Sequence, residues 1–204
     1  MANLDASYNL DAPRRITASN LPLPSKYLGE ANAEPGVEVS DEKLVIESLG
    51  DGSFRRGVIG TSRQVPTTND GHGPIALDTI PGAGIVMPGG VNCYFLDIAP
   101  HTDGPLHRTT STDYVIAIRG QLSILTPKAD VYHINDGKAT CADDLVETVA
   151  LPGDVIYQRG PVHALANRTN EWVRACCFVL GSDPNRVTVD GAAGHRELPD
   201  QWLA

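Results

Sequence analysis

Short apolar segments separated by turn residues fill the chain from residue 91 to residue 181. Gly, Pro and Asn bound these segments, and such residues favour turns and are rare inside strands. The expected strands of this region are Val91–Ile98, Tyr114–Ile118, Leu122–Thr126, Glu147–Leu151, Val155–Gln158, Val162–Ala166 and Trp172–Leu180. Strands this short and this regularly spaced predict an all-β barrel or sandwich.

The size of the chain fits one domain. It has 204 residues, of which 41% are hydrophobic, which is enough for one core but little for two. We expect residues 91–181 to form the barrel core and residues 1–90 to be an N-terminal extension with edge strands, within the same domain. Residues 182–204 are expected to be a C-terminal tail whose end docks on the body or on a neighbour.

Charge and cysteine content exclude several classes of function. The net charge of −9 would repel a phosphate backbone, so no nucleic-acid partner is expected. No apolar run reaches the roughly 20 residues that span a bilayer, and no basic start precedes an apolar leader. The chain has four cysteines and no C-x-x-C pair, and Cys176 and Cys177 should point to opposite faces of a strand. These features predict free thiols and a cytoplasmic protein without membrane contact.

Polar side chains gather on one face just before the strand expected at 114–118. In an extended chain His107, Thr109, Ser111 and Asp113 project to the same side. Their face combines an imidazole, hydroxyls and a carboxylate. A single histidine near a strand end is more often a structural residue, so this segment is either a turn or one wall of a chemical site.

A second polar group follows the strand expected at 155–158. Gln158 and Arg159 lie in a Gly-Pro turn, and His163 and Asn167 share one face of the next strand. A small closed barrel has room for side chains or one small ligand, so both polar faces can meet inside it. We expect Gln158 inside and Arg159 at the rim, where its guanidinium suits an anionic substrate group; a surface turn is the alternative for both.

The first polar segment resembles the first motif of the cupin superfamily. That motif is usually His-x-His, three or four residues, Glu, six residues and Gly, and here it is His107-x-Thr109, Asp113 and Gly120. The usual second motif runs from a Gly-Asp turn to a His and an Asn four positions on.

The second motif is present as Gly153-Asp154, His163 and Asn167. The resemblance implies a single cupin barrel, a double-stranded β-helix of the jelly-roll type. The residues of both motifs are similar to those of small single-domain cupins of natural-product pathways, notably polyketide tailoring enzymes.

The resemblance also implies a metal set, which this chain departs from. Thr109 replaces the second histidine and Asp113 replaces the glutamate, so the remaining ligands are His107, Asp113 and His163. Two histidines and a carboxylate are the ligands of non-haem iron oxygenases. One divalent ion (Fe, Mn, Zn or Ni) is therefore one expectation, and its absence is the other. Without a metal, these residues would work as acids and bases, with a carboxylate fixing the histidine tautomer.

Three functions remain open on this basis. The first is a lyase or isomerase that dehydrates, decarboxylates, aromatises or cyclises a polyketide-like small molecule, with His107, His163 and Asp113 as catalytic residues. The second is a mononuclear metal-dependent oxidoreductase, and the third is a non-catalytic binding protein. Substrate contacts are expected from Thr109, Gln158, Arg159, Tyr94 and Asn167. The resemblance further implies a homodimer in which N-terminal strands cross to the partner.

Overall fold

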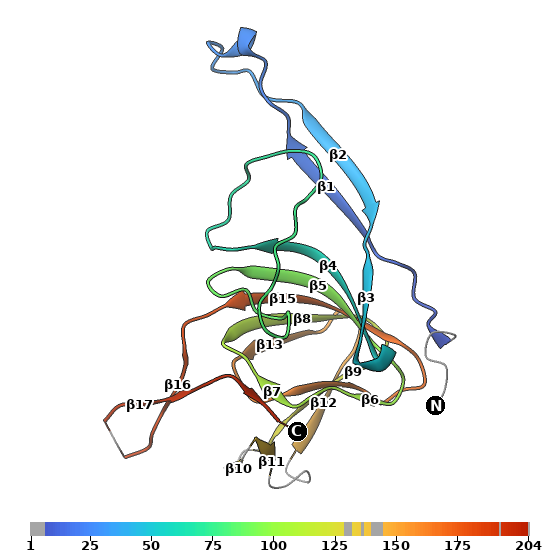
Figure 1. The fold of residues 1–204 in the computed structure, drawn as a ribbon, viewed down its shortest axis with the longest axis vertical. Helices are drawn as coiled ribbons and strands as arrows, with labels where there is room; N and C mark the ends of the chain where they lie inside the picture. The colour runs from blue at the N-terminus through green and yellow to red at the C-terminus, as the bar shows by residue number, and fades with distance from the viewer. Residues whose placement is uncertain (1–6, 129–131, 136, 140–144, 192, 204) are drawn as a thin grey trace.

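Two antiparallel sheets form the body of the protein in the computed structural model, which describes residues 7–128, 132–135, 137–139, 145–191 and 193–203 (Figure 1). The larger sheet has the strand order β13–β8–β15–β5–β4–β3, and the smaller has the order β12–β9–β14–β6. The strands of the larger sheet are β3 (Ile46–Leu49), β4 (Phe54–Ser62), β5 (Val91–Ile98), β8 (Ser111–Arg119), β13 (Val155–Arg159) and β15 (Val173–Gly181). Those of the smaller sheet are β6 (Thr102–Asp103), β9 (Leu122–Pro127), β12 (Leu145–Ala150) and β14 (Ala164–Asn167).

The other elements are short pairs outside these sheets. They are β1 (Arg14–Asn20) with β2 (Val37–Lys43), β7 (His107–Arg108) with β18 (Gln201–Trp202), β10 (Ile134–Asn135) with β11 (Lys138–Ala139), and β16 (Asn185–Thr188) with β17 (His195–Leu198). Two 3-10 turns are described, η1 (Ser25–Tyr27) and η2 (Gly50–Gly52). The predicted all-β jelly roll is confirmed, and the strands expected between residues 91 and 181 lie within two residues of the observed ones, except that β8 begins three residues earlier than expected. The described residues include no helix that is long and apolar enough to cross a membrane.

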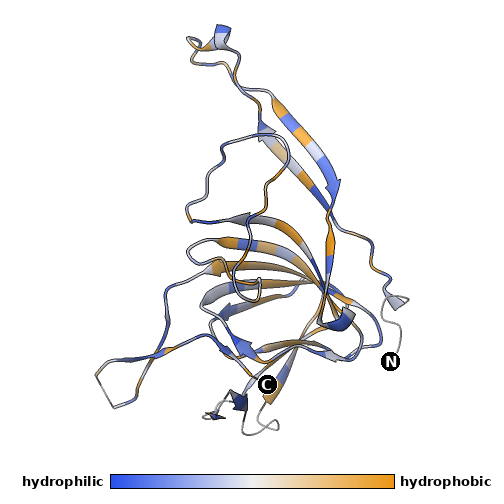
Figure 2. Ribbon diagram, viewed as in Figure 1, coloured by the Kyte–Doolittle hydropathy of each residue, from blue (hydrophilic) through white to orange (hydrophobic). Residues whose placement is uncertain are grey.

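The core lies between the sheets because alternate side chains of each strand point inward. Ile98, Leu122 and Val173 are fully buried there, and the apolar positions run along the central strands (Figure 2). Burial of one such side chain contributes roughly 1.5–3 kcal/mol. This core fixes the strands whose inward faces carry the polar residues of the site.

The N-terminal region contributes to the barrel and also leaves it. Strands β3 and β4 belong to the larger sheet, whereas the β1–β2 hairpin extends away from the body (Figure 1). On this hairpin Ile16 is 62% exposed and Val39 is 65% exposed. The crossing of this region to a partner subunit stays a prediction.

The C-terminal tail docks on the body. Strand β18 pairs with β7, so that Trp202 lies opposite His107. The backbone N–H of Leu203 donates to the carbonyl of Leu106 (2.9 Å), and Nε of Arg108 donates to the carbonyl of Pro199 (2.9 Å). The tail therefore reaches the segment that carries the first polar motif.

Candidate functional site

A cavity of about 370 Å³ opens between the two sheets and is mostly apolar. Its size is in the range of small-molecule sites. Polar and ionisable side chains from several strands reach it, namely Arg56, Tyr94, His107, Thr109, Asp113, Gln158, His163 and Cys177. Two distant segments thus meet as predicted, and His107, Asp113 and His163 line one cavity.

The two histidines face each other across a β-bridge. The backbone N–H of His107 donates to the backbone carbonyl of His163 (2.9 Å), and the backbone N–H of His163 donates to the backbone carbonyl of His107 (2.8 Å). The ring centroids are 4.5 Å apart and the rings are tilted by 51°. This reciprocal backbone pair holds both imidazoles at the cavity wall.

Backbone carbonyls fix the tautomer of each ring. Nδ1 of His107 lies 2.9 Å from the carbonyl of Pro105, and Nδ1 of His163 lies 3.1 Å from that of Pro161. A carbonyl only accepts, so each Nδ1 carries the proton and each Nε2 is the basic nitrogen. The tautomer is set here by a carbonyl, where we expected a carboxylate. Both histidines belong to a Pro-x-His sequence, a repeated signal that sequence reasoning overlooked.

The environment keeps both imidazoles neutral. The pKa of His163 is lowered to about 4, mainly by burial and also by the coulombic effect of His107, against a small opposing effect of the Pro161 carbonyl. Burial also lowers the pKa of His107. At neutral pH each ring therefore presents an unprotonated Nε2.

Asp113 is shifted in the opposite direction. Burial raises the pKa of its carboxyl to about 6, although a hydrogen bond from Ser111 lowers it somewhat. Ser111 is itself 2.9 Å from the hydroxyl of Thr109. The pKa of the acid is raised and the pKa of the base is lowered, so protonated Asp113 and neutral His107 occur together over a wider pH range. This arrangement suits acid–base catalysis.

Two polar atoms in the cavity have no partner among the described residues. They are Oδ1 of Asp113 and Nε2 of Gln158, and the two residues lie directly opposite each other on β8 and β13. A buried polar group without a partner costs about 1–3 kcal/mol. A ligand that accepts from Gln158 and contacts Asp113 would recover this energy.

Tyr94 and Cys177 line the cavity from β5 and β15, in the same sheet as Asp113 and Gln158. They are cross-strand neighbours, both buried, and they share a hydrogen bond. Burial is the main reason that both pKa values are raised well above the ordinary ones. Tyr94 thus lies where substrate contact was predicted. Cys177 faces the cavity whereas Cys176 does not; both are free thiols, as is Cys93, and Cys141 lies outside the described residues.

Two predicted substrate contacts are corrected. The side chain of Asn167 is fully buried but does not line the cavity, because its amide donates to the carbonyls of Ile98, Ala99 and Glu171. It stabilises the end of β14. Arg159 is exposed at the end of β13 and does not line the cavity, so the substrate contact expected from it is not observed.

Sequence reasoning also missed two residues. The indole of Trp202 stacks on the ring of His107, with centroids 4.5 Å apart and planes 5° apart. Arg56 reaches the cavity from β4, on the same face of the strand as Phe54. The alternation of β4 indicated an inward face for Arg56, whereas nothing local indicated that the tail returns to His107.

The side chains present do not form the metal set that the resemblance implies. Among the described residues no group of three or more His, Cys, Asp or Glu side chains is arranged to hold a metal ion. The hydroxyl of Thr109, at the position of the missing histidine, is hydrogen-bonded to the hydroxyl of Ser111. The side chains of the cavity can act as acids and bases without a metal.

The comparisons with known proteins agree with the motifs and the fold. The chain is 26% identical to the cupin-domain-containing oxidoreductase fogC of Aspergillus ruber over 146 residues, which are 71% of this chain and 64% of the relative. The chain is therefore similar in sequence to a cupin-domain protein, as its motifs indicate. No protein-family model matches it.

The chain also resembles proteins of a phomopsin biosynthesis cluster. It is 28% identical to the phomopsin biosynthesis cluster protein D of Diaporthe leptostromiformis, over 56% of this chain and 51% of that protein. Curated relatives are thus matched over 51% to 64% of their own length. Solved structures similar to it include the polyketide cyclase RemF of Streptomyces resistomycificus, with a TM-score of 0.42 and 12% identity over 79% of this chain and 80% of that one.

Proposed function

We propose that this cupin is a small-molecule tailoring enzyme of natural-product biosynthesis that catalyses a lyase or isomerase reaction without a redox step. The observation that carries the proposal is the pairing of two neutral imidazoles with a carboxyl of raised pKa in one apolar cavity. The natural-product cluster proteins among its relatives support the class of substrate.

The base in this reaction is Nε2 of His107. The pKa of His163 is lowered to about 4, which makes its ring the weaker base, whereas that of His107 is less perturbed. His107 removes a proton from a carbon next to a carbonyl group, and the electrons of the C–H bond move to the carbonyl oxygen. Gln158 donates through its free Nε2–H to the resulting enolate.

The acid is the protonated form of Asp113. It gives its proton to a leaving hydroxyl, and the enolate re-forms the carbonyl as the C–O bond breaks and water leaves. Without a leaving group, proton return at another carbon gives an isomer. His107 then loses its proton to Asp113 through solvent, which restores both groups. The apolar walls keep other water from quenching the enolate.

Deuterium incorporation tests the proposal without the natural substrate. 2-Tetralone has an acidic carbon next to its carbonyl, and its exchange in D₂O is followed by mass spectrometry with chelator present. We expect the protein to accelerate the exchange above the buffer rate, and His107→Gln to remove most of this acceleration. Equal rates with and without protein, or with the variant, would contradict the assignment.

The name of one relative favours a second candidate, a metal-dependent oxidoreductase. In that case His107, His163 and Asp113 would be its ligands, and the metal would supply oxygen or electron-transfer chemistry. Its signature is oxygen added to a product only after iron is supplied. Such a product from a chelator-sensitive protein would replace the first proposal with the second.

A further inference from the structure

One arginine lines the described cavity, and nothing in the acid–base chemistry uses it. Arg56 lies on β4, and its side chain is 13% exposed and lines the cavity. The histidines of the cavity are neutral at pH 7, because their pKa values are lowered. Arg56 is therefore the only fixed positive charge among the described lining residues.

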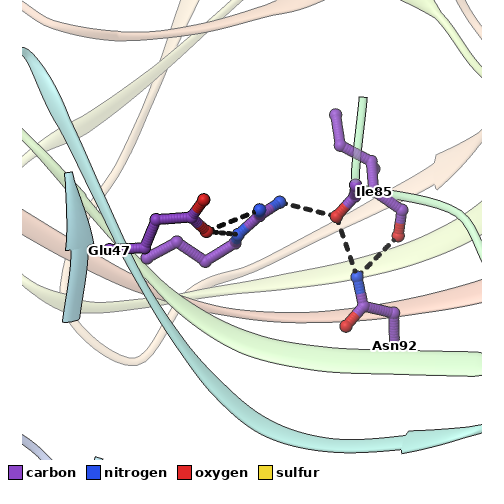
Figure 3. A network of polar contacts seen from close by, with 5 residues as sticks. Glu47, Ile85 and Asn92 are labelled. Atoms are coloured by element: carbon purple, nitrogen blue, oxygen red, sulfur yellow. Dashed lines mark hydrogen bonds and ion pairs between the residues drawn. The ribbon is translucent and has the colours of Figure 1, made fainter. Parts of the chain in front are cut away.

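The guanidinium is held in a built site. Its Nη1 donates to the carbonyl of Gly84 (2.6 Å), and Nη2 donates to Oε2 of Glu47 (2.8 Å), which Nε also approaches (3.3 Å). Nδ2 of Asn92 donates to the carbonyls of Gly84 (3.2 Å) and Ile85 (2.8 Å) and so fixes the loop behind the arginine (Figure 3). The network joins β3, β4, β5 and the loop before β5.

Glycine at position 84 is required by this arrangement. Its φ is +73°, a conformation that favours glycine, and a Cβ there would lie 2.8 Å from Nη1 and 2.9 Å from Nη2 of Arg56. A side chain at this position would push the guanidinium away. The loop thus leaves room for an arginine that is already oriented before a ligand arrives.

The guanidinium keeps donors for a ligand. An arginine has five N–H groups, and three of those of Arg56 have partners among the described residues. The other two are one on each Nη. The side chain of Glu47 is 55% exposed, so solvent screens its charge, whereas the arginine faces a mostly apolar cavity in which its charge acts more strongly.

We propose that Arg56 is a substrate-positioning residue that binds an anionic oxygen, a carboxylate or a phenolate, on the small molecule that this cavity accepts. This inference rests on the proposed function, whose substrate class it narrows. The anion-binding role that the sequence predicted for Arg159 is thus assigned to Arg56. Binding through Arg56 also fixes which carbon of the substrate lies next to His107.

A pair of probes of equal shape tests the inference by isothermal titration calorimetry. The probes are 2-naphthoate, which carries a carboxylate, and 2-naphthamide, which is neutral. We expect wild-type protein to bind the naphthoate at least ten-fold more tightly, and Arg56→Met to lose this preference while its affinity for the amide changes little. Arg159→Met is the matched control and should keep the preference.

Two other variants test the inference if Arg56→Met does not fold, and distinguish the role of Arg56 from the proposed acid–base reaction. If Arg56→Met fails to fold, Glu47→Gln keeps the guanidinium and should bind the naphthoate as tightly as wild type or more tightly. Equal affinity of wild type for both probes, retained preference in Arg56→Met, or weaker naphthoate binding by Glu47→Gln would overturn the inference. His107→Gln should lose tetralone exchange but keep the naphthoate preference, so either proposal can fail alone.

Discussion

Replacement of Asp113 by Asn should stabilise the protein while it inactivates the site. Asp113 is only 6% exposed, and its pKa rises from the ordinary 3.8 to about 6 in the folded state. Since the folded pKa is the higher one, stability is fully present below pH 4 and falls as the pH rises to about 6. A difference of about two in pKa, at about 1.4 kcal/mol each, corresponds to about 3 kcal/mol at pH 8.

His163 changes the free energy of unfolding in the opposite direction over the same pH range. Its folded pKa of about 4 lies below the ordinary 6.5, so it lowers stability as the pH falls from 6.5 to 4. The two effects largely cancel between pH 4 and pH 6 in the wild type. Asp113→Asn removes one of them, so the free energy of unfolding of this variant should rise from pH 4 to pH 6.5.

Urea unfolding at pH 4, 6 and 8 measures this difference. We expect Asp113→Asn to exceed wild type by up to about 3 kcal/mol at pH 8 and by almost nothing at pH 4. The exposed Asp183→Asn serves as the control and should change neither value. A natively folded Asp113→Asn that is no more stable than wild type at pH 8 would show that the carboxyl is not desolvated as described.

Further predictions concern turnover and packing. Tetralone exchange, corrected for the buffer rate, should hold level above pH 7 and fall at low pH as His107 gains a proton; a rate that does not fall at low pH contradicts the role of His107 as the base. Trp202→Ala should reduce kcat for exchange about ten-fold, because His107 loses the ring that holds its orientation, with recovery in Trp202→Phe and no change in Gln201→Ala. Asn167→Ala should cost about 3 kcal/mol in urea unfolding, since two buried carbonyls and one partly buried carbonyl lose their donor, whereas a loss of ligand affinity without a loss of stability would point back to a substrate contact.

Strand alternation and turn residues were sufficient to predict most of the barrel. The segment Val91–Ile98 is a strand with the predicted bounds, and His107, Thr109 and Asp113 share the inward face that their spacing indicates. Local pattern succeeds here because each strand has one buried face, which fixes the direction of its side chains.

Local pattern fails where long-range contacts decide. The spacing of Asn167 predicts that it shares a strand face with His163. Its amide instead donates to three carbonyls near the ends of other strands, so its role is structural. Trp202 reaches His107 only because the tail pairs with β7, and no periodicity encodes that return. The prediction of an extension over residues 1–90 does not place Arg56 in the barrel, although β4 lies inside the larger sheet.

The central claim is that two neutral imidazoles, each with an unprotonated Nε2, meet in the cavity as bases. ¹⁵N NMR of the histidine side chains at pH 7, before and after chelator treatment, tests it most directly. The account predicts that His107 and His163 each show one protonated nitrogen, Nδ1, and one imine-type nitrogen, Nε2, unchanged by the chelator. A doubly protonated ring at pH 7, or an Nε2 resonance that moves when metal is removed, would contradict the account.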